Sequence, residues 1–311
     1  MSTERLVLTC TYSIWLLLGF ILQSLVLYLI FRHSPKSFRM FRFLLAEAAI
    51  FQFLALMSTY FTQLGLVTNV QLIEVRSFGF CRFCAPWICF TTYLTTLMFV
   101  WLSSTAIFST FYFKYLSFVS LIISTSHIHK FCVISHIPAF LFIFLEVWMY
   151  YELSPTFPKY QLTDLSEYSQ VSLLPNTSKS YASVFLLMTI SSFVFPFICW
   201  YFRKRILHEL NIRMTRMSVT KRANHALFVT GLTIQIMVPI VVYPAAFAIF
   251  YHCTYREVEL PHPDLSSFLT IGVPALTDPI VSLYFVTPFR KVIYSWLFQS
   301  SSKFVPVSKT F

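Results

Sequence analysis

"LVLTCTYSIWLLLGFILQSLVLYLIF" (residues 6–31) contains no charged side chain. A helix needs about 20 predominantly apolar residues to cross a bilayer, so this stretch predicts a membrane-spanning helix. It is too long for the apolar part of a secretory signal, and no small-residue cleavage pattern follows it. We therefore expect it to remain in the membrane as a first span.

The same pattern recurs along the rest of the chain. Prolines interrupt the last four apolar stretches, which membrane bundles tolerate because neighbouring helices and waters satisfy the freed carbonyls. Membrane-spanning β-strands are about half as long and alternate in polarity, so a β-barrel is excluded. The sequence predicts an all-α membrane protein, a seven-transmembrane helix bundle that forms a single domain over residues 1–311. The predicted spans are about 7–31, 43–64, 84–111, 131–151, 181–202, 226–251 and 265–286.

The composition agrees with a membrane protein. Hydrophobic residues make up 57% of the chain and charged residues 11%, whereas soluble domains carry about 25% charged residues. The seven cysteines and eight histidines show no zinc-binding spacing, and no hydrolase or nucleotide-binding motif is present. We expect no metal, no cofactor, no enzymatic activity and no nucleic-acid partner.

The basic residues predict the orientation. Seventeen of the 23 lysines and arginines fall in segments 32–42, 112–130, 203–225 and 287–311. Because cytoplasmic loops are enriched in Lys and Arg, these segments face the cytoplasm and the N-terminus is extracellular. The sequon that begins at Asn176 then lies outside, where glycosylation occurs. Segment 287–311 becomes a cytoplasmic tail, in which residues 290–298 are expected to form a short amphipathic helix along the membrane surface.

Three stretches carry a resemblance to a known family. They are "SPKSFRMFRFLLAEAAIFQFLA" (34–55), "MSVTKRANHALFVTGLTIQIMVPI" (217–240) and "DPIVSLYFVTPFR" (278–290). In this order they resemble nematode serpentine chemoreceptors, most closely the Srd group of the Str-type superfamily, over essentially the whole chain. The sequence departs from the family pattern at Glu47 and Gln52, where members carry Asn and Asp, and at Lys114, where they carry Arg.

The resemblance implies a G-protein-coupled chemoreceptor of the plasma membrane of sensory cilia. Its implied partners are a small, apolar ligand such as an odorant, a heterotrimeric G protein and membrane lipid, and a receptor dimer is left open. A multi-span transporter or a ligand-gated ion channel is the alternative. Against that alternative stand the scarcity of glycine, the lack of an inverted repeat with paired broken helices, and the few interior charges.

Acids inside the spans are candidate functional residues because an intramembrane charge is costly. Glu47 either pairs with Arg42 near the membrane surface or faces Asp278 across the bundle, and Glu146 is expected to be wet. Asp278 precedes Pro279, which removes a helical hydrogen bond, so this site is either a hinge or a static kink. The predicted activation switch comprises Glu47, Asp278, Pro279, Tyr284 and Pro239.

Ligand and G-protein contacts follow from the expected topology. A pocket should lie between helices in the outer half of the bundle, although an aromatic residue in a span more often packs than binds. The candidate lining residues are Trp87, Tyr93, Gln235 and Tyr243. The basic inner segments are candidates for G-protein contact, although topology and attraction to anionic lipid explain part of their charge. The candidates are Lys114, Arg213, Arg216, Lys221 and Arg222.

The receptor resemblance also implies a disulfide between the start of span three and the loop after span four. Cys81 or Cys84 can supply one end, but residues 152–180 contain no cysteine. Cys253 and Cys10 are the other outer cysteines, and the sequence singles out no pair.

Overall fold

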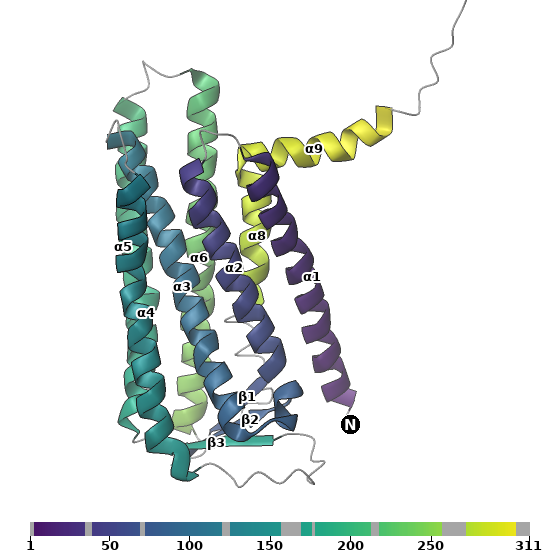
Figure 1. The fold of residues 1–311 in the computed structure, drawn as a ribbon, viewed down its shortest axis with the longest axis vertical. Helices are drawn as coiled ribbons and strands as arrows, with labels where there is room; N and C mark the ends of the chain where they lie inside the picture. The colour runs from purple at the N-terminus through teal and green to yellow at the C-terminus, as the bar shows by residue number, and fades with distance from the viewer. Residues whose placement is uncertain are drawn as a thin grey trace, which may run out of the picture.

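Helices dominate the computed structural model, which describes residues 3–34, 39–68, 72–119, 125–156, 169–175, 178–212, 218–256 and 272–302. Long helices run side by side along the length of the molecule, and one helix leaves the bundle sideways at one end (Figure 1). The helices are α1 Thr3–His33, α2 Arg39–Thr62, α3 Pro86–Val119, α4 Thr125–Leu153, α5 Lys179–Ile212, α6 Val219–Arg256, α8 Val273–Phe285 and α9 Thr287–Ser302.

The helices agree with the predicted membrane architecture. Six of them, α1 to α6, contain a stretch long and apolar enough to cross a membrane, and α8 is a shorter apolar helix. The expected seventh span, 265–286, contains α8, and its first seven residues, 265–271, lie outside the described residues. The prediction of a helical membrane bundle is therefore confirmed.

A small sheet covers one end of the bundle, near the N-terminus (Figure 1), and the sequence patterns did not predict it. Strands β1 Leu64–Thr68, β2 Leu72–Ser77 and β3 Ser169–Pro175 are antiparallel in the order β1-β2-β3. The register pairs Leu64 with Ser77 and Leu72 with Pro175. Because β3 follows α4 in the chain, the sheet joins the α4–α5 connection to the α2–α3 connection. We call this end of the bundle the sheet end.

A disulfide between Cys81 and Cys89 lies beside the sheet, with the two Cα atoms 5.4 Å apart. It links the 3-10 helix η2, Phe80–Phe83, to the first turns of α3. A second short 3-10 helix, η3 Ser154–Thr156, follows α4. Cys10 and Cys84 are free, and the side chain of Cys253 lies outside the described residues. Neither Cys81 nor Cys84 is bonded to the α4–α5 connection. The pairing of β2 with β3 joins that connection to the start of α3 instead.

The buried core is continuous along α3, and the outer helix faces remain apolar. One cluster packs Leu29, Leu44, Phe111, Phe228 and Phe289 near α9, and a second packs Phe90, Trp101, Phe142 and Met149 nearer the sheet end. On the outer faces, Phe144 is 79% exposed and Phe197 is 73% exposed. Helices that are apolar all round belong in lipid, which solvates these exposed side chains.

Helix α9 turns away from the bundle axis immediately after α8 (Figure 1). Phe289 is fully buried and holds its start in the bundle. Trp296 packs against Tyr28 and His33 of α1, with ring centroids 6.2 and 5.9 Å apart. The prediction of a short amphipathic helix at the C-terminal side is confirmed, and we call this end of the bundle the α9 end.

Candidate functional site

A buried polar network joins four helices in the middle of the bundle. Asp278 on α8 is 3% exposed, and its Oδ2 accepts a hydrogen bond from Gln52 Nε2 on α2. Gln52 Oε1 in turn accepts from Gln23 Nε2 on α1 at 2.9 Å. Gln235 on α6 donates to the backbone carbonyl of Asp278 at 3.2 Å and to Ser282 Oγ at 3.0 Å. These five residues, Gln23, Gln52, Gln235, Asp278 and Ser282, are called the polar network below.

The polar network satisfies the break that Pro279 makes in α8. A proline has no backbone N–H, so the carbonyl four residues earlier, that of Ala275, has no helical donor. Gln23 Nε2 donates to this carbonyl at 3.1 Å. The kink in α8 is therefore supported by a side chain from α1, as membrane helices with prolines require.

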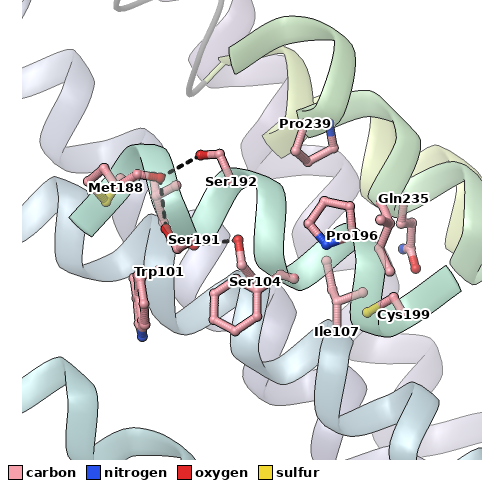
Figure 2. Close-up of a pocket in the computed structure, with 13 residues that line it drawn as sticks. Trp101, Ser104, Ile107, Met188, Ser191, Ser192, Pro196, Cys199, Gln235 and Pro239 are labelled. Atoms are coloured by element: carbon pink, nitrogen blue, oxygen red, sulfur yellow. Dashed lines mark hydrogen bonds between the residues drawn. The ribbon is translucent and has the colours of Figure 1, made fainter. Parts of the chain in front are cut away.

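A small cavity borders the polar network. Its volume is about 40 Å³ on the α3–α5–α6 side, where it is lined by Val100, Trp101, Ser104, Ile107, Met188, Ser191, Ser192, Phe195, Pro196, Cys199, Gln235, Ile236 and Pro239. Figure 2 shows Ile107 from α3 near Pro196 and Cys199 from α5, with Gln235 from α6 beside them. We call this space the core cavity.

Proline breaks mark two of the three helices that line the core cavity. Pro196 leaves the carbonyl of Ser192 without a helical donor, and Pro239 does the same to Gln235. Ser191 and Ser192 each donate to the carbonyl of Met188, at 2.8 and 2.7 Å. The cavity thus has apolar walls and a few polar groups, which is the usual character of a small-molecule site.

A second space, about 20 Å³, lies within the polar network. Asp278 Oδ1 and Gln23 Oε1 are buried and have no hydrogen-bond partner within the described part of the chain, and both residues border this space together with Gln52, Gln235 and Ser282. A space of this size has room for one water molecule. Gln235 lines both cavities, so it is the residue that connects the core cavity with α8.

Lys114 ties three helices together at the α9 end. It is 4% exposed, and its Nζ lies 2.9 Å from His225 Nδ1 on α6. The same Nζ lies 5.1 Å from the ring centroid of Phe41 on α2 and 4.9 Å from that of Phe228 on α6. Cations over aromatic faces are attracted by the ring quadrupole, so Lys114 bonds α3 to both neighbours.

Glu47 has a partner that the sequence did not predict. Its Oε1 lies 2.6 Å from His136 Nε2 on α4, so neither of the expected partners, Arg42 or Asp278, is bonded to this oxygen. Asp278 is bonded by Gln52, one helical turn further along α2. The proposed Glu47–Asp278 pair is therefore wrong, because the rotation of α2 turns Glu47 toward α4.

The remaining predicted switch residues lie in different parts of the structure. Pro279 is buried beside the polar network, and Pro239 lines the core cavity. Tyr284 is 56% exposed and packs against Phe285, with ring centroids 4.9 Å apart. It therefore faces away from Asp278. Glu146, expected to be exposed to water, has its Oε1 buried, and this atom has no hydrogen-bond partner among the residues described.

The predicted pocket residues do not lie together either. Gln235 lines the core cavity, but Trp87 is 50% exposed at the start of α3. Tyr93 packs at the edge of the cluster at the sheet end, and the side chain of Tyr243 lies outside the described residues. Among the predicted G-protein contacts, Arg222 Nη2 lies 3.5 Å from Asn211 Oδ1. Arg213, Arg216, the side chain of Lys221 and the sequon residue Asn176 lie outside the described residues.

Sequence reasoning missed Gln23 and Ser282, and it noted Gln52 only as a departure from a family pattern. Gln23 and Gln52 are amides inside apolar spans, and intramembrane polar side chains usually face the bundle interior. That signal could have selected both residues. Ser282 carries no comparable signal, because a serine can bond its own helix.

Comparisons with known proteins agree with this architecture. The profile of the family described as serpentine type seven-transmembrane G-protein-coupled receptor chemoreceptor Srd matches residues 8–295. Serpentine receptor class delta-40 of Caenorhabditis elegans is 30% identical over 312 residues, which cover 98% of this chain and 97% of the relative. Serpentine receptor class delta-45 of the same organism is 26% identical, with 94% and 93% covered. The chain belongs to the Srd family of serpentine seven-transmembrane chemoreceptors.

Proposed function

We propose that this chemoreceptor binds a small, apolar molecule at the core cavity and signals through a heterotrimeric G protein. The observation that carries the proposal is the position of Gln235. This one side chain lines the core cavity and also bonds the carbonyl of Asp278 and the hydroxyl of Ser282. A change in the shape of the core cavity would therefore be transmitted to α8 through the hydrogen bonds of this side chain.

Ligand binding in this proposal widens the bundle. The core cavity is about 40 Å³, whereas small-molecule sites measure roughly 300–1,000 Å³. A ligand must therefore separate α5 from α6. Pro196 and Pro239 support this step, because a helix bends most easily where a hydrogen bond is missing.

Movement of α6 at the core cavity would be transmitted to the α9 end through Lys114. His225 is on α6, ten residues before Gln235, and its bond to Lys114 holds α6 against α3. If α6 moves outward, this bond breaks and the α9 end opens. Lys114 and the basic residues around Arg222 would then contact the G protein, together with Arg213, Arg216 and Lys221.

The proposal includes an orientation. The end of α5, the start of α6 and α9 lie at one end of the bundle (Figure 1), and the basic residues on them support placing that end in the cytoplasm. The N-terminus and Asn176 would then be extracellular, at the plasma membrane of a sensory cilium. We expect Asn176 to be glycosylated in cells. The Asn176→Gln variant should lack this glycan.

The test is a ligand screen in cells, with calcium or cyclic nucleotide as the readout. Once a ligand is found, Ser104→Phe, which fills the core cavity, should raise the ligand concentration for half-maximal response at least tenfold at matched surface expression. Gln235→Leu should abolish the response. Trp87→Ala is the control and should leave the response unchanged.

Two outcomes would refute the proposal. A response that Ser104→Phe leaves unchanged while Trp87→Ala reduces it would place the ligand elsewhere. A current that survives blockade of G proteins would favour the ion-channel alternative.

A further inference from the structure

A larger hollow lies on the lipid-facing side of α5 and α6. Its volume is about 410 Å³, and it is lined by Phe111, Ser192, Phe193, Pro196, Phe197, Cys199, Trp200, Arg203, Thr233, Ile236, Met237 and Ile240. Phe193, Phe197 and Met237 are exposed, so the hollow opens toward the bilayer. We call it the α5–α6 groove.

We propose that the α5–α6 groove binds one anionic phospholipid, with its phosphate on Arg203 and an acyl chain along the groove. Arg203 is the only charged side chain among the lining residues. Its Nε is buried and, among the residues that the structure describes, has no hydrogen-bond partner. Its guanidinium lies 4.9 Å from the ring centroid of Trp200. A guanidinium at the end of an apolar groove, with an Nε that has no hydrogen-bond partner among the described residues, matches the charge of a phosphate.

Side-chain contacts locate Arg203 along the bundle axis. Phe202, the preceding residue on α5, packs against Tyr115 on α3 with ring centroids 5.6 Å apart. The residue before Tyr115 is Lys114, which bonds His225 on α6 at 2.9 Å. Arg203, Lys114 and His225 therefore lie at about the same depth.

These three residues lie at the depth of the membrane surface. Asn224, next to His225, accepts a hydrogen bond from Thr287 Oγ1 at 3.2 Å. Thr287 is the first residue of α9, the amphipathic helix that leaves the bundle sideways (Figure 1). Amphipathic helices in this position lie in the headgroup region, so Arg203 is at headgroup depth.

The length of the α5–α6 groove fits one leaflet. From Arg203 to Phe193 there are ten residues of α5, which span about 15 Å at 1.5 Å per residue. The hydrocarbon core of a bilayer is about 30 Å thick. The groove therefore extends from the headgroups to about the middle of the membrane, as an acyl chain does.

Photoaffinity labelling of the purified full chain in micelles tests the proposal. The probe is phosphatidylglycerol with a diazirine in its acyl chain, and labelled peptides are mapped by mass spectrometry. Labelling is expected on peptides that contain Phe193 to Phe197 and Met237 to Ile240. Unlabelled phosphatidylglycerol should displace the probe at about one tenth of the concentration of phosphatidylcholine with the same chains. Both lipids carry a phosphate, but the choline cation of phosphatidylcholine offsets its charge, whereas the net negative charge of phosphatidylglycerol is attracted to Arg203.

Three variants separate the phosphate contact from the groove. Arg203→Gln should abolish the tenfold preference but keep labelling of the groove. Lys204→Gln is the matched control, because Lys204 is adjacent and exposed but does not line the groove, and it should keep the preference. Thr233→Trp should fill the groove and remove labelling from these peptides.

The proposal is overturned if the wild-type chain shows no preference between the two lipids, or if Arg203→Gln keeps it. Labelling that Thr233→Trp leaves unchanged would also overturn it. Soluble glycerol 3-phosphate is a further competitor, and equal displacement by this tail-free phosphate would exclude a phospholipid as the occupant. All these measurements concern binding, so their outcome is independent of ligand response and of G-protein coupling.

Discussion

Pro279 and Gln23 should be energetically coupled although they lie on different helices. Gln23 Nε2 makes two hydrogen bonds, to Gln52 Oε1 and to the carbonyl of Ala275. The second bond exists because Pro279 supplies no helical N–H to that carbonyl. Pro279→Ala restores an N–H at this position, so the Ala275 carbonyl no longer depends on Gln23.

The expected magnitudes follow from the number of bonds. Interhelical hydrogen bonds in membranes are worth about 0.6 to 2 kcal/mol each. Gln23→Leu removes two bonds in the natural chain and should lower the free energy of unfolding by about 1 to 4 kcal/mol. In the Pro279→Ala background it removes only the bond to Gln52, so its effect should be roughly half as large.

A double-mutant cycle measures the coupling. The four proteins are unfolded reversibly with SDS in mixed micelles, and helix content reports the free energy of unfolding of each. Ser24→Ala is the control, because Ser24 is next to Gln23 and exposed on the outer face. It should have the same effect in both backgrounds. Additivity of Gln23→Leu and Pro279→Ala within about 0.5 kcal/mol would refute the proposed role of Gln23.

Two other substitutions test the packing and the disulfide. A Cβ atom on Gly231 would lie 2.5 Å from Cβ of Phe285, so Gly231→Ala should force α6 from α8 and cost about 1–3 kcal/mol of unfolding free energy in the same assay; an unchanged value would contradict this contact. Cys81→Ser, Cys89→Ser and the double variant should all destabilise by the same amount, about 2–3 kcal/mol for a short loop, whereas Cys84→Ser should have no effect. Thiol labelling of unfolded protein provides the check, because each single variant should expose one more reactive thiol than the natural chain, whereas one thiol fewer in each single variant would exclude this pair.

The sequence predicted what depends on apolar length. Residues 6–31 are apolar over a full membrane thickness, and α1 covers them. The same holds for α2 to α6, because lipid requires an apolar surface whatever the neighbouring helices are. Prediction of α9 succeeded for a related reason, since Arg290 and Lys291 beside apolar residues define a surface helix.

Helix rotation and pairing could not be predicted in the same way. Glu47 and Gln52 are five residues apart on α2 and therefore face different neighbours, His136 and Asp278. Hydropathy does not determine these directions, because the apolar residues of a lipid-facing helix surround it on all sides. The sheet was missed because the short strands lie in connections whose pairing depends on how the helices bring them together.

The bond from Gln23 to Ala275 joins positions 252 residues apart in the chain. During synthesis α1 enters the membrane first and α8 last, so this contact cannot form until the whole bundle has been inserted. Until then, Gln23 and Gln52 can bond each other but lack their partners on α8. A chain that ends before α8 therefore loses more than that helix. It also leaves polar side chains of three other helices without their partners on α8, so the stability of the first helices depends on completion of the chain.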